Sequence, residues 1–288
     1  MPELPEVETV RRGLHELIIG RIIKSVHHDT SKSFPNAVAD VQAFMINASI
    51  TDVRRRAKVL MIDLSTAYTL VIHLKMTGQL VYRGELVFGA GHPNESLIGE
   101  LPDRSTRVTL SFTDGSKLFF NDQRKFGWMK LMPTIEVPNI DFMKKVGPEP
   151  LEADFTSSEF AARFARRART SIKAAILDQT VVAGVGNIYA DESLWGAKIH
   201  PKRLVNTITS GEFELLYTEL RAVMNLAIQK GGSTDKNYVN AEGKRGSYMD
   251  FARVFRREGL ACPRCGNEII KFKAAGRGTH ICPHCQVL

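Results

Sequence analysis

Apolar residues recur at helical spacing at the start of the chain and at strand spacing after it. Apolar positions from Leu4 to Leu17 follow at steps of three and four residues, which predicts an amphipathic helix over 3–17. The sequence TDGS at 113–116 is typical of a hairpin turn. Short apolar runs separated by turn signals predict strands over 59–64, 69–74, 79–82, 108–112, 117–120 and 128–132. The first half is therefore predicted to be β-rich, with one helix attached.

The second half of the chain changes to helical periodicity. Helices are predicted over 157–169, 170–177, 189–196 and 211–230. Between the halves, residues 133–150 contain four prolines and no strong period, which indicates a linker. Residues 84–104 are rich in Gly, Pro and Asn, so we expect a surface excursion without chemistry there. Residues 231–250 are polar and glycine-rich, which predicts a mobile loop.

Composition narrows the class of protein. The chain has 288 residues, enough for two domains with separate cores, and its hydrophobic content of 43% is ordinary for a globular protein. It has no apolar run near the roughly 18 residues of a membrane span. The net charge is +8, and residues 251–288 carry +5 of it, with seven Lys/Arg against two Asp/Glu. A basic module of this kind favours a nucleic acid partner, the alternative being a merely solubilising basic surface.

All four cysteines lie in two identically spaced pairs near the C-terminus. These are CPRC at 262–265 and CPHC at 282–285. Two such turns can offer four thiolates to one tetrahedral zinc ion. Disulfides fit less well because nothing at the N-terminus resembles a secretory signal, and a redox pair would not need a second copy. The pattern therefore predicts a structural zinc ion held by Cys262, Cys265, Cys282 and Cys285.

The N-terminus offers a second candidate chemistry. Because residue 2 is small, removal of Met1 would expose the nitrogen of Pro2 as a secondary amine, which is a nucleophile for an anomeric carbon. Glu3 and Glu6 place carboxylates within one turn of that amine, where they could act as acid or base. A plainer interpretation remains open, because Pro is suited to a helix start and acids there complement the helix dipole.

Both ends and five internal motifs together resemble the bacterial formamidopyrimidine-DNA glycosylase family. The ends are MPELPEVETV at 1–10 and GRGTH at 276–280 followed by CPHC. Between them, in order, are RRRAK at 54–58, HLKMTG at 73–78, DQRKFG at 122–127, GPEPL at 147–151 and VAGVGNIYA at 182–190. Each motif is weak alone, but their ordered coincidence over nearly the whole chain is specific.

The resemblance implies an α+β fold in four parts. These are a catalytic β-sandwich domain with its N-terminal helix (1–134), a linker (135–150), a helix–two-turn–helix domain with a lesion-capping loop (151–250) and a β-hairpin zinc finger (251–288). It implies a bifunctional DNA glycosylase/AP lyase of base excision repair that removes 8-oxoguanine and formamidopyrimidines. The partner would be double-stranded DNA with a damaged base, bound by a monomer in the cytoplasm at the nucleoid, with no membrane association.

The resemblance also implies roles for single residues. Pro2 would be the nucleophile, Glu3 the acid/base group, Glu6 a support for the amine, and Lys58 a cation near the reacting nucleotide's phosphate. Phosphate ligands would be Lys173, Asn187 and Arg277. Without the family, the GVGN turn at 184–187 is equally an ordinary helix–helix turn that glycines permit.

Three further residues are implied to enter the duplex where the damaged base has left. They are Met76, Arg124 and Phe126. By residue type alone, Met and Phe are more often core residues. The loop from Ser233 to Tyr248 would cover the everted base, whose extrusion costs a few kcal/mol.

The chain departs from the family's pattern at several positions. Lys75 stands where the family often has Gly, and Gln123 and Lys125 replace Pro and Arg of the commoner DPRRFG. These changes leave the phosphate contacts and the substrate range open. Two other hypotheses remain: an endonuclease VIII-like glycosylase for oxidised pyrimidines, and a catalytically silent zinc DNA-binding protein.

Overall fold

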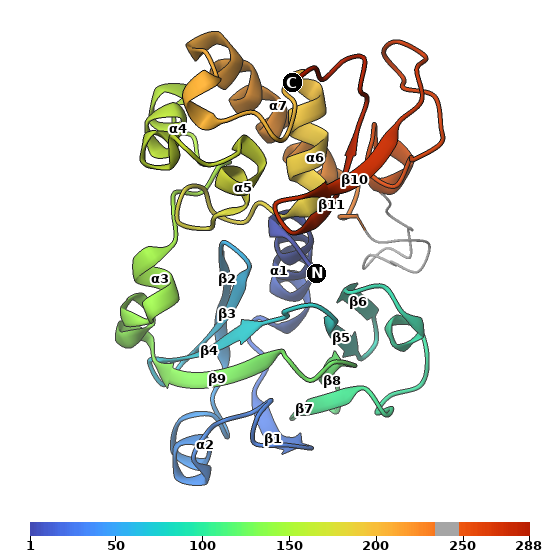
Figure 1. Ribbon diagram of the computed structural model, residues 1–288. Helices are drawn as coiled ribbons and strands as arrows, with labels where there is room; N and C mark the ends of the chain where they lie inside the picture. The colour runs from blue at the N-terminus through green and yellow to red at the C-terminus, as the bar shows by residue number, and fades with distance from the viewer. Residues whose placement is uncertain (234–247) are drawn as a thin grey trace. The chain divides into compact units, whose positions relative to one another are not determined.

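The computed structural model describes residues 1–233 and 248–288, which belong to two compact units (Figure 1). The first unit comprises Met1–Lys144 and Lys230–Ser247, and the second comprises Lys145–Gln229 and Tyr248–Leu288. Among the described residues, no helix is both long enough and apolar enough to cross a bilayer.

The first unit is a sandwich of two antiparallel sheets with a helix at its edge. The five-stranded sheet has the order β1-β7-β8-β5-β6 and the four-stranded sheet the order β2-β3-β4-β9. Apolar residues of both sheets and of α1 (Leu4–Ile18) share one buried core. The strands are β1 (Ile23–His28), β2 (Ile50–Arg56), β3 (Val59–Leu64), β4 (Tyr68–His73), β5 (Gly78–Arg83), β6 (Val87–Gly91), β7 (Thr106–Phe112), β8 (Lys117–Asp122) and β9 (Trp128–Pro133).

The predicted helix and all six predicted strands of this unit are confirmed to within two residues at each end. The pattern missed β1, β2 and the helix α2 (Val38–Phe44), whose exposed positions interrupt the period. The expectation that 84–104 is only a surface excursion was wrong. Residues Val87–Gly91 form β6, which pairs with β5 from Gln79↔Gly91 to Arg83↔Val87. Its sequence, VFGAG, lacks the β-branched alternation that identifies a strand.

The second unit consists of helices followed by a β-hairpin. Its elements are α4 (Ser157–Phe164), α5 (Ile172–Leu177), α6 (Asn187–Gly196), α7 (Ser210–Gln229), β10 (Ile270–Ala274) and β11 (Arg277–Ile281). Thr156 caps α4, since its hydroxyl accepts a hydrogen bond from the Glu159 N–H at 3.2 Å. The helix stops at Phe164 instead of 169, and the next turn is the 3-10 segment η3 (Ala165–Arg167). The residues expected to form the linker contain η2 (Thr134–Asn139) and the short helix α3 (Asp141–Lys145).

Candidate functional site

The N-terminus of α1 is closed by a reciprocal pair of glutamates. Glu3 is the N-cap: its side chain accepts from the Glu6 backbone N–H, and Glu6 Oε2 accepts from the Glu3 N–H at 2.8 Å. Both side chains are buried. The segment is therefore a capped helix start, as the plainer interpretation predicts. The same pair also fixes the carboxylate of Glu3 one residue after Pro2.

The second oxygen of Glu6 holds a distant part of the chain. Glu6 Oε1 accepts a hydrogen bond of 2.7 Å from the backbone N–H of Ser233. The preceding Gly232 has φ +90°, and a Cβ there would lie 3.2 Å from Glu6 Cγ. A glycine is therefore required for the chain to approach Glu6 so closely. The expected capping loop lies outside the described residues except for its two ends, Ser233 and Tyr248.

Lys58 lies on the turn between β2 and β3, which is attached to α1. Glu8 on α1 contacts Arg55 at 3.1 Å, and Arg55 donates to the Ala57 carbonyl at 3.1 Å. Burial alone would raise the pKa of Glu8, but hydrogen bonds from Arg11 and Arg12 and the charge of Arg55 outweigh it and lower that pKa to about 2. Glu8 is therefore ionised at neutral pH. Lys58 itself is 6% exposed, so the turn carries a largely buried cation.

The three residues expected to enter the duplex lie together on two neighbouring turns. Arg124 Nη1 is 2.9 Å from the sulfur of Met76, and its guanidinium carbon lies 4.8 Å from the centre of the Phe126 ring. Phe126 is 44% exposed and Met76 is half-buried, outside the apolar core. An exposed aromatic next to a methionine and an arginine is a surface ready to contact a partner.

Asp122 shapes the turn that presents Arg124 and Phe126, a role that we did not predict. Its carboxylate is fully buried, and it accepts from the backbone N–H groups of Phe126 at 2.8 Å and Gly127 at 2.7 Å, and of Arg124 at 3.1 Å. The hydroxyl of Thr77 donates to the same carboxylate. The available signal was an acid at the end of a strand, three residues before the sequence Lys–Phe–Gly.

His73 is a second site residue to which the sequence analysis assigned no role. Burial lowers its pKa to about 3, with further contributions from the charges of Lys75 and Lys58. Its ring is therefore neutral at neutral pH. Nδ1 accepts from the Lys75 N–H at 3.0 Å, which leaves the ring proton on Nε2 as a donor. Lys75 has φ +52°, a left-handed conformation that explains why glycine is common at this position.

In the second unit, α6 and the hairpin hold Asn187 and Arg277 close together. Asn187 begins α6 and its Nδ2 donates to the Gly278 carbonyl at 2.9 Å. Gly278 follows Arg277 directly, and Arg277 is exposed at the start of β11 beside the turn of residues 275–276. Gly184, with φ +77°, bends the chain before the helix. One hydrogen bond therefore joins the first residue of α6 to the strand that carries the exposed Arg277, next to a helix N-terminus whose dipole favours an anion.

Lys173, which the resemblance implies to be a phosphate ligand, is buried in the second unit. Its side chain is 0% exposed, with Nζ 2.5 Å from Asp191 Oδ1 and 2.7 Å from the Thr279 hydroxyl. Asp191 Oδ2 accepts in turn from the His280 N–H at 2.9 Å. A buried ammonium held by an acid cannot reach a phosphate in this structure. Lys173 instead fastens β11, and with it Arg277, to α5 and α6.

Glu192 is the third residue that the sequence analysis missed. Its carboxylate is fully buried and accepts from the backbone N–H groups of Arg253, Val254 and Phe255 at 2.8–3.1 Å and from the Tyr248 hydroxyl at 3.1 Å. Burial raises its pKa. Glu192 thus holds the start of the C-terminal segment on α6. Its signal was an acidic pair, Asp191 and Glu192, within a helix whose other residues are all uncharged.

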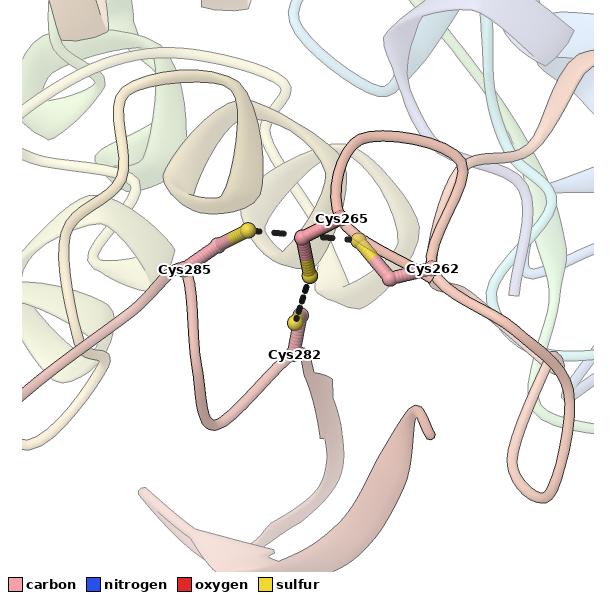
Figure 2. Close-up of side chains that lie close together, drawn as sticks. All are labelled: Cys262, Cys265, Cys282 and Cys285. Carbon is pink, nitrogen blue, oxygen red and sulfur yellow. Dashed lines mark hydrogen bonds between the residues drawn. The ribbon is translucent and has the colours of Figure 1, made fainter. Parts of the chain in front are cut away.

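The four cysteines lie around one point at the base of the hairpin (Figure 2). Their sulfur atoms are all within 4.8 Å of one another, with 4.0 Å between Cys262 and Cys285 and 3.4 Å between Cys265 and Cys282. Tetrahedral Zn–S bonds of about 2.3 Å place sulfurs ~3.8 Å apart, so this donor set fits zinc. Four thiolates leave no open position, which makes the ion structural.

Comparison with known proteins finds formamidopyrimidine-DNA glycosylases along nearly the whole chain, in agreement with the motifs. The model of the formamidopyrimidine-DNA glycosylase N-terminal domain matches residues 1–129, that of its H2TH domain residues 146–238, and a zinc finger found in FPG and IleRS residues 259–287. The formamidopyrimidine-DNA glycosylase of Pediococcus pentosaceus is 42% identical, with 100% of both chains covered.

Solved structures from Lactococcus lactis have the same fold. A complex of an FPG mutant with Fapy-dG containing DNA has a TM-score of 0.88 at 34% identity and covers 100% of both chains. A complex of Fpg with DNA containing an abasic site has a TM-score of 0.87 at 34% identity, covering 99% of this chain and 100% of that one.

Proposed function

Because the chain belongs to the formamidopyrimidine-DNA glycosylase family, we propose that the amine of Pro2 carries out its chemistry on oxidised purines in DNA. The protein is a DNA glycosylase of base excision repair with AP lyase activity and a structural zinc ion. Its preferred lesions are 8-oxoguanine opposite cytosine and formamidopyrimidines. The full-length match to curated formamidopyrimidine-DNA glycosylases supports this choice over an oxidised-pyrimidine enzyme.

The observation that carries the mechanism is the buried glutamate pair next to Pro2. After Met1 is removed, the Pro2 nitrogen attacks the sugar carbon that bears the damaged base. The base departs with the electrons of the glycosidic bond and takes up the proton that the amine loses. Glu3 gives a proton to open the sugar and then takes the proton that the resulting iminium acidifies on the neighbouring carbon. Loss of the two flanking phosphates follows by successive eliminations. Glu6 supports this arrangement by holding the Glu3 backbone N–H at 2.8 Å.

DNA binding is divided among the remaining residues. We assign the Met76, Arg124 and Phe126 cluster to the space left by the everted base, with Arg124 contacting the orphaned cytosine. Lys58 and the neutral Nε2–H of His73 face phosphate oxygens in the first unit, and Asn187 and Arg277 grip the backbone in the second. Lys173 acts through the hairpin as a positioning residue. We assign the covering of the base to the segment 233–248, which lies outside the described residues except for its two ends.

Borohydride trapping tests the nucleophile. The purified protein is incubated with a duplex carrying one 8-oxoguanine opposite cytosine, reduced, and digested for mass mapping of the cross-linked residue. We expect the adduct on Pro2. Trapping should fall by orders of magnitude in Pro2→Gly, whose free amine is primary and less constrained, and in protein that retains Met1, where the nitrogen is part of an amide. Pro5→Ala is the matched control and should still trap. An adduct on a lysine, or full activity of Pro2→Gly, would contradict the mechanism.

The proposal also covers the oligomeric state, the location and the lesion preference of the protein. The protein acts as a monomer in the cytoplasm, associated with the nucleoid, which sedimentation and imaging of a tagged chain can check. A matched duplex with an oxidised pyrimidine measures the lesion preference. Faster excision of the pyrimidine than of 8-oxoguanine would favour the endonuclease VIII-like alternative.

A further inference from the structure

A cavity in the second unit is lined by cations and lies apart from Asn187 and Arg277. It has a volume of about 440 Å³ and lies where the end of α4, η3 and the α5–α6 connection meet. Its polar lining comes chiefly from Lys145, Arg163, Arg166, Arg167 and Thr180. Among the described residues that line it, none is acidic and none is aromatic. The cavity therefore combines positive charge with no surface for stacking a base.

Two of the arginines are held in place by the cavity wall. Arg163 donates to the Thr180 carbonyl at 2.9 Å and to the Val181 carbonyl at 3.4 Å. Arg167 is paired with Asp178 at 2.6 Å. The carbonyls that hold Arg163 carry no net charge, so its guanidinium is ordered without being neutralised. An ordered, uncompensated guanidinium binds an anion with little further loss of side-chain entropy.

The other two cations are exposed and unpaired. Within the described part of the chain, neither Arg166 nor Lys145 takes part in an ion pair, and both are exposed. With Asp178 offsetting Arg167, the cavity retains three positive charges in a space large enough for several phosphate groups. Planar guanidinium groups bind phosphate oxygens in a bidentate manner.

We propose that this cavity is a second phosphate-binding site, which takes a ligand with two or more adjacent phosphate groups and does not recognise a base. The ligand can be a free polyphosphate or the backbone of DNA outside the lesion site, since the chemistry is the same. This site is independent of the glycosylase reaction, because none of its residues belongs to the proposed catalytic or lesion-binding set.

The test uses the full-length, zinc-loaded protein and trimetaphosphate, a weak metal chelator, as the probe. Titration calorimetry at low ionic strength is done in an Arg277→Ala background, which removes the cation of the other phosphate site. We expect saturable binding that Arg166→Ala weakens about tenfold or more, the loss typical of one charged hydrogen-bonding partner. Arg169→Ala, an exposed arginine outside the cavity, should leave binding unchanged, and thermal melting should show that both variants stay folded.

Duplex DNA then identifies the source of the phosphate. If it is the DNA backbone, Arg166→Ala lowers the log–log salt slope by about one on a long duplex and leaves a short duplex over the lesion unchanged. If it is a free polyphosphate, both duplexes bind as before while trimetaphosphate binding is lost. Either result supports the site. Absence of saturable trimetaphosphate binding, or an equal loss from Arg169→Ala, overturns it.

Discussion

One carboxylate oxygen of Glu6 accepts the backbone N–H of Ser233 at 2.7 Å, across 227 residues of sequence. The other oxygen accepts the Glu3 N–H at 2.8 Å. The residue that leads into the expected capping loop and the residue that follows the proposed nucleophile are therefore held by the same side chain. Displacement of one would be felt by the other, since both depend on one buried carboxylate.

Glu6→Gln should weaken both functions of this side chain. A glutamine has one acceptor oxygen, so its amide nitrogen must face one of the two N–H groups. We expect excision of 8-oxoguanine to fall roughly ten- to hundredfold, which corresponds to about 1.5–3 kcal/mol for hydrogen bonds to a charged group. Single-turnover excision measures this, with Glu16→Gln on the exposed side of α1 as the control.

Gly232→Ala tests the hydrogen bond between Glu6 and Ser233 separately from the one between Glu6 and Glu3. It strains chiefly the loop entry, where φ is +90°. The added Cβ lies 3.2 Å from Glu6 Cγ, but Glu6 keeps the oxygen that accepts the Glu3 N–H. Excision of the lesion should fall while cleavage at an abasic site is largely retained. An equal loss of lesion excision and of abasic-site cleavage would show that the hydrogen bond of Glu6 to Ser233 cannot be disturbed without affecting the one to Glu3.

Met76→Ala should affect activity far more than stability. Met76 lies outside the apolar core beside Arg124, so its truncation should change the free energy of unfolding by less than about 1 kcal/mol. Excision from a paired duplex should drop sharply, and cleavage at an abasic site less, because no base is extruded there. Met45→Ala in the core is the contrasting control and should cost about 2–5 kcal/mol. A large fall in melting temperature for Met76→Ala would place it in the core instead.

Lys173→Ala should chiefly lower the stability of the protein, whereas Arg277→Ala should chiefly weaken DNA binding. Removing Lys173 leaves Asp191 buried without its cation, which should destabilise the second unit by about 3–5 kcal/mol. Removing the exposed Arg277 should change stability by less than about 0.5 kcal/mol and lower the salt slope of DNA binding by about one. Denaturant unfolding and binding at several salt concentrations distinguish them. A stable Lys173→Ala protein with a reduced salt slope would restore direct phosphate binding by this lysine.

His73 should make the fold sensitive to acid. Its pKa is about 3 in the folded protein and about 6.5 in an unfolded chain. Between these values the unfolded state binds the extra proton, so the free energy of unfolding falls as the pH drops from about 6.5 toward 3. His73→Gln should flatten this dependence, and the exposed His27→Gln should not. Urea unfolding at a series of pH values gives both slopes. Parallel curves for His73→Gln and the parent would show that His73 is not the titrating group.

Zinc removal should disorganise the hairpin. Metal analysis should find one equivalent of zinc per chain, and Cys282→Ser should lower it and weaken DNA binding, because Arg277 lies on the same hairpin. His284→Ala, an exposed residue between two of the ligands, should keep both zinc and affinity. Less than half an equivalent of metal in carefully purified protein would contradict the assignment.

Local pattern and motif order were sufficient to predict much of this protein. Periodicity located α1 and six of the nine strands of the first half, because apolar contacts repeat every two residues in a strand and every three to four residues in a helix. The spacing of the cysteine pairs was enough to predict the zinc site, since each pair needs only one tight turn to form. The ordered motifs identified the family before any contact was known.

Tertiary structure decided which polar side chains became buried and what they hold. No local signal distinguishes Lys173, fully enclosed with Asp191, from a lysine on an exposed helix face. Likewise, β6 forms because β5 offers it a partner, and Glu6 meets Ser233 only after the chain has folded. Burial and long-range hydrogen bonds depend on which surfaces pack together. Sequence periodicity reports only local structure, so it does not reveal contacts between residues far apart in the chain.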